Sequence, residues 1–125
     1  MKSVLILGAK SDMAKATAIV YAQNGWDLYL AGRDINSELS QFANELKNEF
    51  HCGINLYHLD ILDFQSHSEF FRSFKQKPHG VICFIGLLGD QKKSQIDFSE
   101  TKTVIDSNFT GIVSLFNNFA NYYEE

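Results

Sequence analysis

Cysteine and proline are scarce in this sequence of 125 residues, which has two cysteines, Cys52 and Cys83, and one proline, Pro78. Two cysteines are too few for the disulfide framework of a small secreted scaffold. Cys83 lies within an apolar run, where a thiol behaves as a small hydrophobic group. We therefore expect reduced cysteines and a cytoplasmic location.

Long apolar segments and a strong charge imbalance are also missing. The first apolar run, Val4 to Leu7, is too short for the core of a signal peptide or for a membrane span. The net charge of -4 creates no overall field that attracts nucleic acid or an anionic membrane, although a local basic pocket can still hold one phosphate. We therefore expect neither a nucleic-acid partner nor membrane insertion.

Metal-ligand spacing is missing as well. None of the four histidines stands at such a spacing from either cysteine. They are His51, His58, His67 and His79. We expect them in turns or on the surface, and we expect no metal site.

Hydrophobic residues nevertheless make up 45% of the chain, enough for the core of one domain. Short apolar segments that suit strands alternate with segments of helical periodicity. The expected strands are Val4–Leu7, Trp26–Leu30, Ile54–His58 and Val81–Ile85. This alternation predicts an α/β fold, with a doubly wound parallel sheet in the strand order 3-2-1-4 and helices on both faces. The fourth strand is then an apolar sheet edge, although its composition is typical of burial on both faces.

Each expected helix has an apolar face. These faces comprise Met13, Ala16, Ile19 and Val20 in a first helix that closes at Gly25; Leu39, Phe42, Ala43, Leu46 and Phe50 in a second; and Phe70, Phe71 and Phe74 in a third. Asp63 is expected to cap the third helix and Pro78 to end it. After a polar loop over residues 86–94, Asp97 and Glu100 form a capping-box pair that begins a long last helix. Its stripe is Ile105, Phe109, Ile112, Val113, Phe116, Phe119, Ala120 and Tyr123.

The turn after the first strand carries the first candidate binding residues, Gly8-Ala9-Lys10-Ser11-Asp12-Met13-Ala14. Gly8 permits a sharp turn that brings backbone N–H groups to a diphosphate, and Ala14 is small enough for the helix to approach the sheet. One glycine at such a turn is equally consistent with a tight connection that binds nothing.

The turn after the second strand reads Ala31-Gly32-Arg33-Asp34. NAD-binding proteins of this fold carry an acid here for the ribose hydroxyls, and NADP-binding ones often carry a cation for the 2′-phosphate. Arg33 offers a planar fork of donors and Lys10 a second positive charge, so the sequence favours NADP(H). The alternative is a solvated Arg33 that pairs with Asp34.

These turns resemble those of the short-chain dehydrogenase/reductase family, and the resemblance covers essentially the whole chain. The family turn Thr-Gly-x-x-x-Gly-x-Gly is matched at Gly8, whereas Leu7, Asp12 and Ala14 depart from it. The segment Leu59–Asp63 is similar to the family's Asp-hydrophobic-x-Asp element, whose first acid binds the adenine amino group. The resemblance implies that Asp60 and Ile61 flank adenine. A turn acid at the strand end is the alternative for Asp60.

Two later segments extend the resemblance. The family's Asn-Asn-Ala-Gly corresponds to Cys83–Gly86, where only the glycine is kept. Gly86 is thereby expected to let the nicotinamide ribose approach the backbone. The segment Val104–Gly111 looks like the family's fourth-helix segment, in which an asparagine holds the active-site lysine through a water. Asn108 takes this catalytic role by resemblance, or it merely bonds a neighbouring helix carbonyl.

Within the family, the sequence looks like a divergent bacterial branch. The resemblance implies that residues 1–125 form a Rossmann-like domain. It also implies an NADP(H)-dependent oxidoreductase that acts on a carbonyl or alcohol substrate. The implied cofactor-binding residues are Gly8, Lys10, Ser11, Asp12, Met13, Arg33, Asp60, Ile61 and Gly86. Because the family's Tyr-x-x-x-Lys pair does not occur in the sequence, we expect a truncated chain that is inactive alone. A regulatory module that binds NADP(H) without turnover and a sugar-nucleotide epimerase relative are the alternatives. The apolar edge strand and last helix also predict a homo-oligomer.

Overall fold

The computed structural model describes residues 1–124, which divide into two compact units. The first unit comprises Met1–Asp60 and Gln76–Phe84. The second comprises Ile61–Lys75 and the described residues from Ile85 onward.

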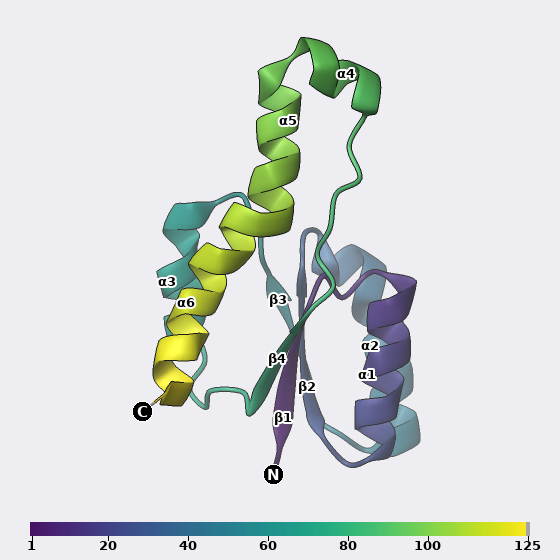
Figure 1. Cartoon of the computed structure of the whole chain (residues 1–125). Coiled ribbons are helices and arrows are strands. Elements are labelled where there is room, and N and C mark those ends of the chain that lie inside the picture. Colours follow the sequence, from purple (N-terminus) through teal and green to yellow (C-terminus); the bar gives the residue numbers. More distant parts are fainter. Residues whose placement is uncertain (125) are drawn as a thin grey trace. The chain divides into compact units, whose positions relative to one another are not determined.

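A parallel sheet in the order β3-β2-β1-β4 forms one layer of the first unit (Figure 1). The strands are β1 (Ser3–Leu7), β2 (Asp27–Gly32), β3 (Ile54–His58) and β4 (Gly80–Cys83). Leu7 is level with Ala31 on β2 and with Cys83 on β4, so the carboxyl ends of these strands lie at one edge of the sheet. The predicted α/β class and strand order are therefore confirmed.

Strand β4 is shorter and more exposed than its apolar sequence predicts. It ends at Cys83, two residues before Ile85, and all of its residues are partly exposed. The prediction of burial on both faces is wrong because β4 is an edge strand, paired only with β1 in the described chain. Its predicted position at the edge is confirmed.

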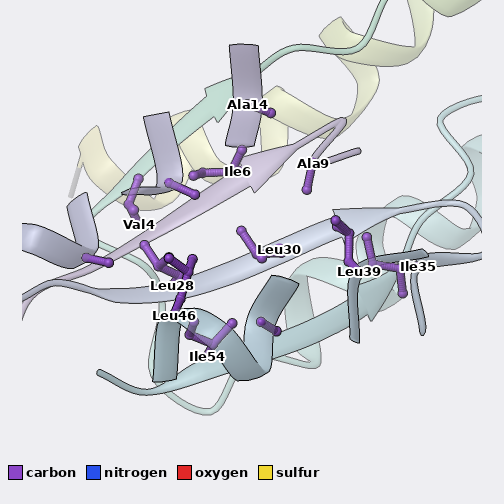
Figure 2. Close-up of a cluster of buried hydrophobic side chains, with 13 residues drawn as sticks. Val4, Ile6, Ala9, Ala14, Leu28, Leu30, Ile35, Leu39, Leu46 and Ile54 are labelled. Atoms are coloured by element: carbon purple, nitrogen blue, oxygen red, sulfur yellow. The ribbon is translucent and has the colours of Figure 1, made fainter. Parts of the chain in front are cut away.

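Helices α1 (Asp12–Gln23) and α2 (Ile35–Phe50) pack with β1 and β2 around one hydrophobic core (Figure 2). The strands contribute Val4, Ile6, Leu28 and Leu30. Helix α2 contributes Leu39, Ala43 and Leu46, as predicted, together with Ile35. Phe42 and Phe50 pack against this core while remaining partly exposed.

The packing face of α1 differs from the predicted one. Its buried residues are Ala14, Ala18 and Ala22, whereas Met13 and Val20 are 71% and 55% exposed. Small side chains let a helix lie close to the strands at native packing density, so the alanines face the core and the bulkier residues do not. Of the other predicted residues, Ala16 is exposed and Ile19 packs against the core only in part.

The second unit is helical (Figure 1). It consists of the 3-10 turn η1 (Phe64–Ser66), α3 (His67–Arg72), α4 (Gln91–Ile96), α5 (Phe98–Ile105), the π-helix η2 (Asp106–Thr110) and α6 (Gly111–Glu124). The ring of Phe119 on α6 meets the rings of Phe71 and Phe74 edge-on, with centroids 5.0 and 6.2 Å apart. These aromatic contacts join α6 to the segment around α3.

The helix boundaries of this unit correct three predictions. Helix α3 ends at Arg72, well before Pro78, and the Asp63 side chain makes no cap hydrogen bond. Part of the predicted polar loop is α4, because the Asp90 carboxylate accepts the N–H groups of Lys92 and Lys93 at 3.0 and 3.1 Å. An acceptor at this position satisfies N–H groups of the first turn and stabilises the helix start.

The predicted long last helix is divided by η2, and within its predicted stripe Phe119 is the one residue that is fully buried. The buried residues are Ser107, Gly111, Leu115 and Phe119. Ile105, Phe109, Val113 and Tyr123 from the predicted stripe are exposed by 43% or more. A π turn shifts the phase of a helix, and here small residues occupy much of the packed side.

The start of this segment also differs from the capping box. Asp97 does cap α5, but its carboxylate accepts the Ser99 N–H at 2.9 Å. The Ser99 hydroxyl donates to the same oxygen at 2.7 Å. These hydrogen bonds hold the pKa of Asp97 below its ordinary value.

Candidate functional site

The turn between β1 and α1 is organised by a left-handed glycine. Gly8 has a φ of 72°, and its N–H and that of Ala9 donate to the Ala31 carbonyl at 3.0 and 3.1 Å. These two hydrogen bonds fasten the turn to the end of β2. A side chain at Gly8 would meet the steric penalty of the left-handed region.

Ser11 begins α1 with its side chain, because its Oγ accepts the Ala14 N–H at 3.1 Å. Asp12 and Met13 stand in the first helical turn, where no carbonyl of the helix can accept from their N–H groups. These donors lie at the positive end of the helix dipole. The start of α1 therefore suits an anion such as a diphosphate.

The turn between β2 and α2 lies against the first one. Gly32 is buried, and a Cβ on it would lie 4.0 Å from the Ala9 nitrogen and 3.5 Å from Ile35 Cδ1. Arg33 is exposed, and within residues 1–124 no carboxylate lies within ion-pair distance of it. The alternative pairing of Arg33 with Asp34 is therefore not seen. Its guanidinium is available to a ligand phosphate.

Lys10 is engaged within the first unit. Its Nζ lies 3.4 Å from Glu38 Oε1 on the first turn of α2. The Lys10 side chain is 32% exposed and that of Glu38 57%. The two predicted cations thus differ, since Arg33 has no ion pair in the described chain and Lys10 has one.

The segment after β3 reaches the same sheet edge. Leu59 donates its N–H to the Gly32 carbonyl at 3.0 Å. Asp60 follows directly and is partly buried. The predicted adenine-binding acid is therefore one residue beyond a backbone hydrogen bond to the turn that carries Arg33.

In the second unit, Asn108 on η2 pairs with both backbone groups of Leu87. Its Oδ1 accepts the Leu87 N–H and its Nδ2 donates to the Leu87 carbonyl, each at 2.7 Å. A Cβ on the exposed Gly86 would lie 3.6 Å from Asn108 Oδ1. The alternative of a bond to a helix carbonyl is not what Asn108 makes. Its side chain instead fixes the backbone next to Gly86.

Replacing Asn108 by alanine is expected to free this backbone. We expect the Leu87 amide to exchange with solvent about fivefold faster, since about 1 kcal/mol of hydrogen bonding is lost. Hydrogen exchange followed by NMR measures this. Asn118→Ala is the control, because Asn118 Nδ2 donates only to the Ser114 carbonyl of its own helix, at 3.3 Å. Unchanged Leu87 exchange in Asn108→Ala would show that the pair does not hold the loop.

Ile61 lies inside the second unit. It is 8% exposed, and a Cβ placed on Gly111 would lie 2.5 Å from its carbonyl oxygen and 2.9 Å from its Cγ1. The close approach of these two backbones explains why position 111 is a glycine. The role of Ile61 beside adenine stays a prediction.

A charged pair precedes Asn108 on the same helical segment. The Lys102 ammonium donates to the Asp106 carboxylate, one helical turn further along. This hydrogen bond holds the pKa of Asp106 below its ordinary value.

Two partners of the predicted site residues were not predicted from the sequence: Leu87, which pairs with Asn108, and Glu38, which pairs with Lys10. For Glu38, the sequence does offer one signal, an acidic residue in the first turn of a helix. For the Leu87 backbone, the sequence offers none.

Neither a metal-binding group of residues nor a membrane-spanning helix is found among residues 1–124. No three His, Cys, Asp or Glu residues among residues 1–124 group together to hold a metal ion. Across the same residues, no helix combines the length and apolar character that a membrane span needs. Cys52 is partly buried, and desolvation raises the pKa of its thiol.

A family model described as short chain dehydrogenase matches residues 2–125, so the chain belongs to the short-chain dehydrogenase family. Sulfoacetaldehyde reductase 2 of Chromohalobacter salexigens is 29% identical to it over 119 residues, which are 90% of this chain and 45% of that protein. The chain thus spans less than half the length of this curated relative.

Solved structures share the fold. A short-chain dehydrogenase from Sphingobium yanoikuyae in complex with NADPH superposes with a TM-score of 0.84 at 23% identity, over 98% of this chain and 48% of that one. An alcohol dehydrogenase from Thermococcus sibiricus complexed with 5-hydroxy-NADP gives 0.80 at 24% identity, over 97% and 52%. The Rossmann-like fold of the family is therefore confirmed.

Proposed function

We propose that this chain is the cofactor-binding part of an NADP(H)-dependent oxidoreductase that converts a small carbonyl compound to an alcohol or the reverse. One observation carries the proposal. The exposed Arg33 has no ion pair in the described chain, and its turn lies against the turn in which Asp12 and Met13 present N–H donors. A diphosphate suits the start of α1, and a 2′-phosphate suits the planar fork of Arg33.

The relatives support both parts of the proposal. The Sphingobium and Thermococcus proteins are described with NADPH and with 5-hydroxy-NADP, which favours a phosphorylated cofactor. The Chromohalobacter relative is a reductase named for an aldehyde, which favours a carbonyl substrate. Family membership also favours a catalytic role over a regulatory one.

The remaining residues take the following proposed roles. Asp60 and Ile61 flank adenine, and Gly86 lets the nicotinamide ribose approach the backbone. When bound, the nicotinamide would supply or accept the hydride. Asn108 takes the place of the family asparagine that holds the active-site lysine through a water, and the Tyr-x-x-x-Lys motif that carries this lysine does not occur in residues 1–125. An amide side chain accepts two hydrogen bonds and donates two. Asn108 therefore keeps one lone pair and one N–H beyond its two bonds to Leu87.

Calorimetric titration of the 125-residue chain with NADPH and NADH tests the proposal. We expect a micromolar-range dissociation constant for NADPH, about 8 kcal/mol of binding free energy, and a value at least about tenfold weaker for NADH. Circular dichroism on the same samples reports whether the chain is folded. A folded chain that binds neither dinucleotide, or that prefers NADH, would remove the proposal. Self-association into a homo-oligomer stays a separate proposal.

A further inference from the structure

We infer that Glu38 is a specificity-determining residue, which weakens the preference of this site for a 2′-phosphate by holding Lys10 in an ion pair. The inference deepens the proposed NADP(H) function and rests on it. It concerns only residues of the first unit. Glu38 is not one of the residues to which a cofactor-binding role has been given above.

The geometry joins three charged residues at one edge of the sheet. Lys10 lies in the turn fastened to the Ala31 carbonyl by the N–H groups of Gly8 and Ala9. Arg33 lies two residues after that carbonyl on the same chain segment. Glu38 lies on the first turn of α2, and its Oε1 is 3.4 Å from Lys10 Nζ. The ion pair therefore joins the turn between β1 and α1 to the start of α2, the helix that follows the turn carrying Arg33.

The ion pair is weak enough to be exchanged. Both side chains are partly exposed, at 32% and 57%, and exposed pairs of this kind contribute little because water screens them. A phosphate monoester carries a charge of about -1.5 to -2 at neutral pH and three acceptor oxygens. The Lys10 ammonium, on its flexible four-carbon stem, therefore gains by leaving the single carboxylate for the phosphate.

Glu38 nevertheless adds a modest cost to this exchange. When Lys10 turns to the phosphate, the Glu38 carboxylate loses its partner. A cofactor without the 2′-phosphate requires no exchange, so NADH binding does not depend on the pair. Glu38 thus lowers affinity for NADP(H) selectively and leaves Arg33 as the cation that is free from the outset.

The test is the variant Glu38→Gln, with affinities for NADPH and NADH measured by calorimetry. We expect NADPH to bind about two- to fivefold tighter and NADH to change by less than about 1.5-fold. Glu49→Gln is the matched control. It removes the same charge from an exposed position of α2, about 16 Å further along the helix axis, and we expect it to change neither affinity.

A second pair of variants tests whether Glu38 acts through Lys10. Lys10→Met is expected to weaken NADPH binding, and in this background Glu38→Gln is expected to bring no further gain. A gain that persists without Lys10 would overturn the inference, because Glu38 would then act directly on the phosphate. An unchanged NADPH affinity in Glu38→Gln, with normal NADPH binding by the unaltered chain, would overturn the inference alone. Failure of the unaltered chain to bind NADPH would remove the proposed function and the inference together.

Discussion

Replacing Arg33 by glutamine is expected to weaken NADPH binding by about 10- to 100-fold and to leave NADH binding within about twofold. Glutamine keeps a polar side chain but removes the positive charge and the planar fork that matches a phosphate. Arg33 is exposed and has no ion pair in the described chain, so its loss breaks no salt bridge of the folded protein. The free energy of unfolding is therefore expected to stay within about 0.5 kcal/mol. Calorimetric titration with both dinucleotides measures the effect.

The other arginine of the chain supplies the control. Arg72 is exposed at the end of α3, in the second unit, and Arg72→Gln removes the same charge. We expect it to leave both affinities unchanged. Equal loss of NADPH affinity in the two variants would indicate a general charge effect. Equal loss of NADPH and NADH affinity in Arg33→Gln would show that Arg33 does not read the 2′-phosphate.

The strands of this fold were predictable because their sequence signal is local. The first strand, Val4 to Leu7, is a short apolar run that ends at Gly8, whose positive φ is a property of glycine itself. The alternation of strands and helices then leaves few possible topologies for a parallel sheet. Strand order and the edge position of β4 followed from that restriction.

The faces of the helices were less predictable because periodicity weights large side chains. Ala14, Ala18 and Ala22 are buried, while the larger Met13 and Val20 are exposed. Small residues are needed where the helix lies close to the strands, and the hydrophobicity of a residue does not indicate the distance between helix and sheet. The predicted stripe of the last helix was largely wrong for an additional reason. The π turn of η2 shifts the phase of the helix, and no residue pattern predicted that turn.

The candidate site shows the same division. Gly8 and Arg33 were identifiable because each is defined by its place at the end of a strand. The Lys10–Glu38 pair depends on the distance between two turns, and the Asn108–Leu87 pair joins residues far apart in the sequence. Contacts of this kind require the three-dimensional structure. Among residues 1–124 they also show that Lys10 forms an ion pair and Arg33 does not, a difference that the sequence does not contain.

Replacing Gly111 by alanine is expected to lower the free energy of unfolding by about 2 to 3 kcal/mol. The added methyl group would lie 2.5 Å from the Ile61 carbonyl oxygen and 2.9 Å from the Asp106 carbonyl oxygen. Both neighbours are backbone atoms, so they cannot move aside as the end of a flexible side chain can. Alanine favours a helix by about 1 kcal/mol over glycine, and the steric cost must exceed this gain. Urea unfolding followed by circular dichroism measures the difference.

Asn117→Ala is the control for this substitution. Asn117 is exposed on α6, six residues beyond Gly111, and alanine there gains helix propensity without a clash. We expect its stability to equal or slightly exceed that of the unaltered chain. If Gly111→Ala were also as stable as the unaltered chain, the Ile61 backbone would not lie against α6 as described. The burial of Ser107, Gly111, Leu115 and Phe119 on one side of η2 and α6 would then need a cause other than contact with the Ile61 backbone.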